Sequence, residues 1–103
     1  MPTIELEIDS KGNPVYHPAV QRAKVGETVD WKFRGSGAFA IVFRQTPFDS
    51  AEFNSARPGG EVRGPPGVYS YAVALVSVVE VKGEKSIGRV VLDAGCPEII
   101  IQR

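Results

Sequence analysis

The sequence predicts an all-β domain, either a sandwich or a barrel. Hydrophobic and polar residues alternate along most of the 103 residues, which is the period of half-buried β-strands. Clusters of Gly and Pro separate the alternating segments, and no long segment has the 3.6-residue period of a helix. The length is typical of one domain and no linker divides the chain, so we expect a single domain over residues 1–103.

About seven strands are expected, joined by turns such as SKGNP (10–14) and KGEK (82–85). The first strand is the plainest, because Ile and Leu alternate with acidic residues. The fifth is the longest, with Tyr69, Tyr71 and Val73 in phase. The expected strands are, in order, TIELEID (3–9), AVQRAKV (19–25), TVDWKFR (28–34), FAIVFR (39–44), VYSYAVALVSVVEV (68–81), SIGRVVL (86–92) and EIIIQ (98–102).

The alternation breaks between residues 45 and 67. Asp49 and Glu52 have the spacing of a helix cap and its reciprocal partner, which indicates a single helical turn at 49–52. The segment RPGGEVRGPPG (57–67) contains seven Gly or Pro residues in eleven, so it is expected to be a loop. Residues 45–67 therefore form an irregular excursion from the domain.

Two short patterns resemble phosphate-binding motifs. GSGAFA (35–40) fits the G-x-G-x-x-A fingerprint of dinucleotide-binding proteins, but that fingerprint works by opening a helix, and here an alternating strand follows. GEKS (83–86) resembles the end of a P-loop, but Glu84 stands where the motif requires Gly. We interpret both patterns as connections between strands.

The charge balance excludes several classes of partner. The chain has 12 basic and 12 acidic residues, and no run of one sign gathers them, so we expect no nucleic-acid partner. The longest apolar stretch, YAVALVSVV (71–79), is too short to span a membrane. The first residues lack the basic and apolar regions of a signal peptide, so cytoplasmic localisation is the default expectation. A processed exported chain would begin in the same way.

Three motifs share the order and spacing found in one family. KVGETVDWKF (24–33) resembles a Gly-Glu/Asp-Thr-Val-x-Trp strand entry, FAIVF (39–43) a His-x-Val-x-Phe strand, and PPGVYSYAV (65–73) a Pro-Gly-x-Tyr-x-Tyr/Phe-x-Cys stretch. Together they resemble the cupredoxins, the plastocyanin-like family of blue-copper proteins. The resemblance covers most of residues 20–80 and implies a single-domain Greek-key β-sandwich, cupredoxin-like, of about seven strands.

The resemblance also implies where copper ligands would lie, and other residues occupy those positions. A blue-copper site needs two imidazoles and a thiolate, usually with a weak axial Met. Phe39 stands at the position of the first His and Val73 at that of the Cys, while the only His is His17 and the only Met is Met1. We therefore expect a lost copper site, no cofactor, and Phe39 in the core. Whether a small ligand occupies the vacated end near Phe39 and Val73 stays open.

His17 and Cys96 are the remaining residues that could carry chemistry. A His beside Pro in a loop is expected to be a surface residue, and a lone Cys between strands is expected to be a small buried hydrophobe. The acidic neighbours of Cys96 disfavour a reactive thiolate. We expect no catalytic residue and no enzyme activity. Two alternatives are kept: a metal-handling protein that uses Cys96 and His17, and a small enzyme.

The excursion 45–67 is the main candidate for a binding surface, because loops that interrupt a compact scaffold often carry function. It contains Phe48, Phe53, Arg57 and Arg63, a mixture typical of protein–protein contacts. The alternative is that the two phenylalanines only cover one end of the sandwich.

Strand edges offer a second route to a partner. The outer strands IELEI and EIIIQ are expected to be able to pair across subunits, because unpaired strand edges readily add another strand. The sequence thus predicts a non-catalytic cupredoxin-like module, protein-binding or structural. Its partner is an unknown protein, or a second copy bound through an edge strand.

Overall fold

The computed structural model describes residues 2–95 and 97–103, and all regular structure in these residues is β-strand. The prediction of an all-β domain is confirmed. The described residues form ten strands rather than about seven. The strands are β1 (Thr3–Ile8), β2 (Pro14–His17), β3 (Val20–Lys24), β4 (Thr28–Phe33), β5 (Gly37–Phe43), β6 (Glu52–Asn54), β7 (Gly59–Glu61), β8 (Gly67–Val81), β9 (Glu84–Asp93) and β10 (Glu98–Gln102).

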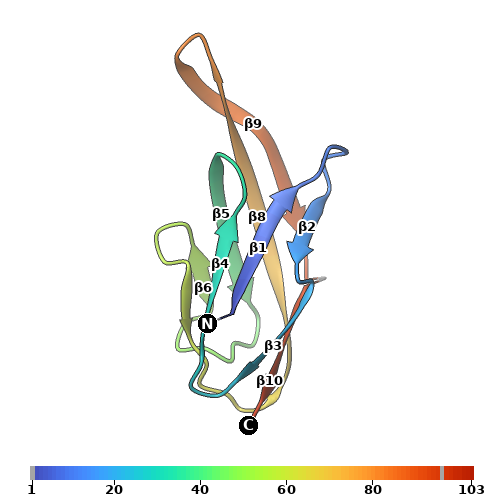
Figure 1. Ribbon diagram of the computed structural model, residues 1–103, viewed down its shortest axis with the longest axis vertical. Coiled ribbons are helices and arrows are strands. Elements are labelled where there is room, and N and C mark those ends of the chain that lie inside the picture. Colours follow the sequence, from blue (N-terminus) through green and yellow to red (C-terminus); the bar gives the residue numbers. More distant parts are fainter. Residues whose placement is uncertain (1, 96) are drawn as a thin grey trace.

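The strands form two sheets that pack as a sandwich (Figure 1). One sheet has the order β2-β1-β4-β7, and the other has the order β3-β10-β8-β5-β6, with β9 also paired to β8. Most neighbours within a sheet are not consecutive in the sequence, so the chain crosses repeatedly between the sheets, as in Greek-key sandwiches. The predicted β-sandwich is therefore confirmed.

The three additional strands, β2, β6 and β7, are short. No helical turn forms at 49–52, so this prediction is wrong. Glu52 instead begins β6, whose Phe53 lies opposite Ile41 of β5 and is 1% exposed. The preceding turn is held by Thr46, whose hydroxyl accepts a hydrogen bond from the Phe48 N–H at 3.0 Å and donates to the Ser50 carbonyl. Burial of Phe53 thus overrides the local capping pattern.

The core lies between the sheets and is rich in aromatic rings. Trp31 is its centre: it stacks on Phe53 with centroids 5.2 Å apart and meets Phe43, Phe48 and Tyr71 edge to face. All five rings are buried. The inward positions of β1, β4, β5, β8 and β10 complete the core with Ile, Leu and Val, as their alternation predicts.

A long hairpin of β8 and β9 extends beyond the end of the sandwich (Figure 1). It gives the molecule an elongated shape of 51 × 24 × 21 Å. Lys82 and Gly83 both have positive φ, the conformation of the two-residue turn that suits the twist of a hairpin. The predicted turn at KGEK is confirmed. Among the described residues, no helix is long and apolar enough to cross a membrane.

Candidate functional site

The positions that the cupredoxin resemblance assigns to copper ligands lie in the hydrophobic core. Phe39 is 7% exposed and Val73 is 3% exposed, and they are not cross-strand partners, because Phe39 lies opposite Leu75 and Val73 opposite Ile41. Burial of Phe39 in the core is confirmed. In residues 2–95 and 97–103, no three His, Cys, Asp or Glu side chains gather in a way that could hold a metal.

A hollow of about 670 Å³ lies beside Phe39. Trp31, Phe33 and Ser55 contribute to its wall, and the Ser55 hydroxyl accepts a hydrogen bond from the Phe39 N–H at 3.0 Å. Val73 does not line this hollow; it lines a separate groove on the outside of the six-stranded sheet. The two positions therefore do not border one shared cavity.

His17 ends β2 and belongs to an ion-pair network on the outer face of the four-stranded sheet. A hydrogen bond of 2.9 Å joins its Nε2 to Oε1 of Glu7, and Arg34 pairs with both Glu5 and Glu7. The hydrogen bond from His17 and the nearby charges of His17 and Arg34 lower the pKa of Glu7. His17 is exposed, as expected. Cys96 lies outside the described residues, so the structure does not test the pair of Cys96 and His17.

The four partner-binding candidates of the excursion 45–67 separate into two kinds. Phe48 and Phe53 are buried in the aromatic core, so they cover one end of the sandwich and offer no surface to a partner. Arg57 and Arg63 are exposed: Arg57 hydrogen-bonds to Asp49 at 3.1 Å and lies over the Phe53 ring, and Arg63 lies 4.0 Å from Glu61.

The expectation that IELEI and EIIIQ are outer strands is wrong. β1 lies between β2 and β4, and β10 lies between β3 and β8, so neither strand has a free edge along its paired length. Ile99 and Ile101 are buried, and Ile100 is half-buried. The consecutive isoleucines of β10 thus find burial within the chain.

The structure shows a different surface, the outer face of β5, β8 and β9. On β5 and β8 the residues of this face alternate with buried ones, and a bulge at Ser77/Val78 shifts the register of β9. Between the level of Ser70 and that of the Glu80–Lys85 pair, the ten outward side chains of the three strands are all apolar. We call these ten residues the outer apolar face: Ala38, Ala40 and Val42 on β5, Ala72, Ala74, Val76 and Val78 on β8, and Ile87, Val90 and Leu92 on β9.

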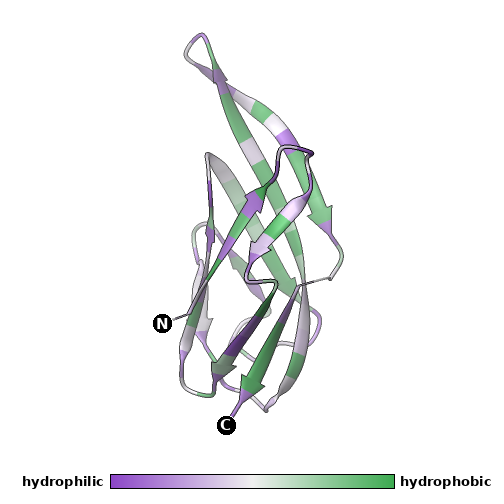
Figure 2. Cartoon of the chain, turned by 45° about the vertical axis from the view of Figure 1, so that its right-hand side comes forward, coloured by the Kyte–Doolittle hydropathy of each residue, from purple (hydrophilic) through white to green (hydrophobic). Residues whose placement is uncertain are grey.

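The larger side chains of this face are strongly exposed. Leu92 is 75% exposed, Ile87 67%, Val90 58% and Val42 46%. Hydrophobic residues run along both strands of the hairpin (Figure 2). One-sided antiparallel sheets normally turn polar residues to the solvent, and a contiguous apolar patch on the surface usually marks a contact site. The outer apolar face is therefore the candidate functional site.

A groove crosses the middle of the outer apolar face. It has a volume of about 300 Å³, and its lining includes Ala40, Ala72 and Ala74 with the larger Val42 and Leu92. The small alanine side chains make this part of the face low relative to the valines and leucine beside it. A groove of this kind can accept apolar side chains from another surface.

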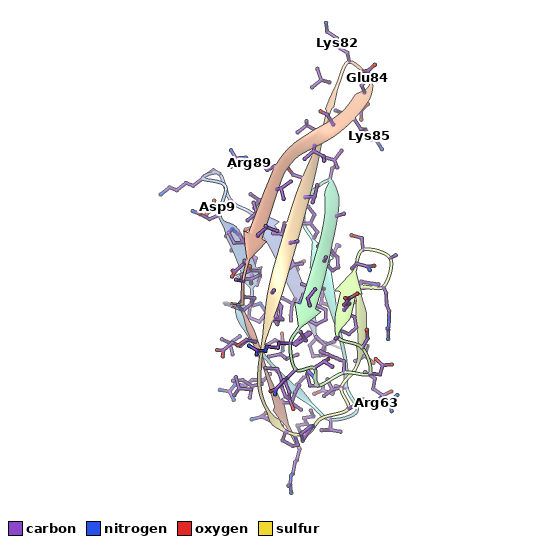
Figure 3. All side chains as sticks on the ribbon, turned by 180° about the vertical axis from the view of Figure 1, so that it is seen from behind. Asp9, Arg63, Lys82, Glu84, Lys85 and Arg89 are labelled. Atoms are coloured by element: carbon purple, nitrogen blue, oxygen red, sulfur yellow. The ribbon has the colours of Figure 1, made fainter. Side chains whose placement is uncertain are left out.

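Polar residues border the outer apolar face. Arg44 and Ser70 follow it at one end, and the cross-strand pair Glu80 and Lys85 follows it at the other. Figure 3 looks onto β5, β8 and β9 and shows Lys82, Glu84 and Lys85 at the hairpin tip and Arg89 beside β9. An apolar centre with a polar border is the usual anatomy of a protein–protein interface.

Sequence reasoning missed this surface, although β8 carries its signal. The alternation of Tyr71, Val73 and Leu75 identifies the buried side of the strand. The opposite phase in YAVALVSVV is Ala72, Ala74, Val76 and Val78, which is apolar as well. A strand that is apolar in both phases indicates that both of its faces are covered by protein.

No protein-family model matches the sequence, and no curated protein matches it. Among solved structures, the chain is similar to a mutant plastocyanin of a fern, with 15% sequence identity and a TM-score of 0.46. The similarity covers 95% of this chain and 99% of the plastocyanin chain. Plastocyanins belong to the cupredoxins, the family that the sequence motifs resemble.

Proposed function

We propose that this chain is a non-catalytic β-sandwich module that has no copper site and acts by binding another polypeptide through the outer apolar face. The observation that carries the proposal is the set of ten outward apolar positions on three neighbouring strands. Leaving this surface in water costs free energy, at about 25 cal/mol for each Å² of apolar area. A polypeptide that covers it recovers that free energy.

The chemistry of the side chains supports the absence of a copper site. Blue copper requires two imidazoles and one thiolate, and this chain has one His and one Cys. His17 lies on the four-stranded sheet and is paired with Glu7, while Phe39 and Val73 fill the implied ligand positions with hydrophobic groups in the core. The residues present do not fit the group that the family binds.

The titratable groups support a role without catalysis. The pKa values of Glu7, Arg34 and Tyr71 depart from their ordinary range. Ion pairing on an exposed sheet face accounts for the first two and burial in the aromatic core for the third. Perturbed groups at active sites are desolvated beside a charged partner and reach an open cleft. Glu7 and Arg34 instead lie on an exposed sheet face, and Tyr71 is enclosed in the core at 1% exposure.

A metal titration tests the first part of the proposal. The reduced, metal-free protein is titrated with Cu(I), Cu(II) and Zn(II) while heat and the visible spectrum are followed, with Cys96→Ser and His17→Ala as matched variants. We expect no stoichiometric binding. Tight binding that either variant loses would favour the alternative, a metal-handling protein that uses Cys96 and His17.

Site-specific photo-crosslinking tests the binding role. A photoreactive amino acid replaces Leu92 on the outer apolar face or, as the control, Val25, which is 45% exposed in the turn after β3. The labelled chain is irradiated in cells of its source. We expect a covalent adduct with a polypeptide from position 92 and none from position 25. Equal labelling from both positions, or none from either, would contradict the binding role.

A further inference from the structure

We infer that the polypeptide covering the outer apolar face is a second copy of this chain, packed sheet to sheet about a two-fold axis that lies between the faces and perpendicular to the strands. The inference rests on the proposed function and names the partner for the same surface. Three properties of the face favour a second copy: the arrangement of its small and large side chains, its charges and its area.

The order of small and large side chains on β8 is complementary to the same strand in the reverse direction. The outward residues of β8 run Ala72, Ala74, Val76, Val78, so the two small side chains come first and the two larger ones second. The two-fold axis makes the copies of β8 antiparallel. If it passes midway between Ala74 and Val76, Ala74 faces Val76 of the second copy, and Ala72 faces Val78. Each low position then meets a high one, which is the condition for close packing at an isologous interface.

The same axis places β9 of one copy over β9 of the other. Leu92 lies opposite Ala74 and Val90 opposite Val76 in the β8–β9 register. In the dimer Leu92 of one copy therefore faces Val90 of the other. These two side chains, 75% and 58% exposed in the single chain, become mutually buried without a change in either copy.

The charges at the two ends of the face are also complementary. Arg44 follows β5 at the level of Ser70, while Glu80 lies ten residues further along β8. Reversal of the strand direction brings Arg44 of one copy to the end of the other that carries Glu80 and Lys85, twice per dimer. Arg44 comes from the β5 side, so Glu80 on β8 lies nearer to it than Lys85 on β9. The chain has a formal net charge of zero at pH 7, so no long-range repulsion opposes the approach of two copies.

The area is close to what a stable dimer needs. At their exposed fractions the ten side chains present roughly 600 Å² per copy, and the polar border adds to this, against about 800 Å² per partner in a standard interface. The two sheets would lie about 10 Å apart, as in stacked β-sheets. A dimer at the lower end of the standard size range can therefore form from this face and its border.

Sedimentation equilibrium from 1 to 500 µM tests the inference with matched variants. Val42→Glu and Leu92→Glu place a carboxylate on the face. Val25→Glu is the control, because Val25 lies off the face and its exposure of 45% is close to the 46% of Val42. We expect the wild-type protein and Val25→Glu to dimerise alike, and the two face variants to dimerise at least ten-fold more weakly. Circular dichroism confirms that each variant is folded.

Thiol crosslinking tests the register. Chains with Ala74→Cys and chains with Val76→Cys, both in a Cys96→Ser background, are mixed in equal amounts and treated with a short bis-maleimide crosslinker, because facing positions on stacked sheets are too far apart for a direct disulfide. The proposed axis predicts that the crosslinked mixed dimer dominates over both crosslinked homodimers. Predominance of either homodimer would overturn this arrangement.

The outcomes separate this inference from the proposed function. A protein that stays monomeric to 500 µM, or a dimer that Val42→Glu and Leu92→Glu leave intact, overturns the second copy as partner. If crosslinking from position 92 then gives an adduct heavier than twice the 11.1 kDa chain, a different protein occupies the face and the binding role stands. If it gives no adduct, both proposals fall.

Discussion

Gly37 shows at the scale of one residue what the GSGAFA segment does. Gly37 begins β5 opposite Ser77, and a side chain there would overlap the Val76 carbonyl oxygen and crowd the Phe33 ring. The glycine allows two backbones to approach closely, which is one of the ordinary uses of this residue. The pattern that resembles a phosphate-binding loop is therefore a packing requirement of the sandwich.

This role predicts the effect of adding one methyl group. Gly37→Ala should lower the free energy of unfolding by about 3 kcal/mol, because the backbone of β8 must move to make room. Gly35→Ala is the matched control, since Gly35 has positive φ but open space around it, and should cost about 1 kcal/mol. Urea unfolding followed by the fluorescence of Trp31 measures both. Equal losses in the two variants would contradict the packing role.

Tyr71 is the second residue with a specific prediction. Among the described residues neither its hydroxyl nor Nε1 of Trp31 has a hydrogen-bond partner, although both atoms are buried. Burial raises the pKa of Tyr71 to about 12; the charge of Asp93 acts in the same direction, and the indole N–H nearby acts against it. At neutral pH the hydroxyl is an unsatisfied polar group in an apolar site.

Tyr71→Phe should therefore leave stability at pH 7 unchanged or raise it by up to about 1 kcal/mol. In the wild-type protein the folded pKa lies above the unfolded value of about 10, so the folded state holds the proton more tightly. The contribution of the Tyr71 hydroxyl to the free energy of unfolding is fully present below pH 10. It falls by about 2 to 3 kcal/mol as the pH rises to 12. The variant should lose this part of the alkaline decline. Urea titrations at pH 7 and pH 11.5 measure it, and identical declines would contradict burial as the cause.

At the scale of the element, the β8–β9 hairpin has two parts, one that belongs to the sandwich and one that extends beyond it. Its lower part belongs to the sandwich, since β5 pairs with β8 up to Ser77 and the Val78 N–H donates to the Ser36 carbonyl at 2.9 Å. Beyond Val78 the hairpin pairs only with itself. Val79 and Val81 are exposed there. The tip therefore contributes little to the core.

Shortening the hairpin tests this division. Val78 and Ile87 are direct cross-strand partners, so residues 79–86 can be replaced by Asn-Gly, the preferred two-residue turn between paired positions. We expect the free energy of unfolding to change by less than about 1 kcal/mol, because the removed side chains are outside the core. The control keeps the full length and changes only Lys82-Gly83 to Asn-Gly. A loss of several kcal/mol on shortening would place the tip in the folding unit.

The elements also show what the sequence could and could not predict. β1, β4 and β5 follow from alternation, because burial of one face imposes a period of two on the sequence. β10 follows from its short run of three isoleucines instead. β6 and β7 are three residues long, too short for a period, and they form because Phe53 and the backbone of β4 need partners. β2 begins at a proline and buries none of its side chains fully, so its sequence has no strand signal.

The candidate site was harder to predict than the fold for a related reason. Alternation reports which residues face the core, and on β8 it identified Tyr71, Val73 and Leu75. It says nothing of what covers the opposite side, where alanines are compatible with either solvent or contact. The burial of Phe48 and Phe53 was equally hidden, because it depends on where the excursion 45–67 returns to Trp31.

At the scale of the whole molecule, the two outer faces of the sandwich differ in kind. The four-stranded sheet turns Glu5, Glu7 and Arg34 to the solvent in paired form. The six-stranded sheet turns the outer apolar face to the solvent. A monomer in water would favour charge on both faces. The asymmetry is what a molecule needs when one side faces solvent and the other faces a partner.

This asymmetry predicts the thermodynamics of self-association. Burial of the apolar face should give a negative heat-capacity change, so the enthalpy of dimer formation measured by calorimetric dilution should become more favourable between 10 and 30 °C. The Kd should change by less than about three-fold between 50 and 500 mM NaCl, because the Arg44 and Glu80 pairs lie at the wet ends of the interface, where exposed pairs contribute little. Sodium sulfate, which strengthens apolar burial, should tighten the dimer instead. A Kd that rises steeply with NaCl would mean that charges hold the copies together, and the surface responsible would then lie elsewhere than on the outer apolar face.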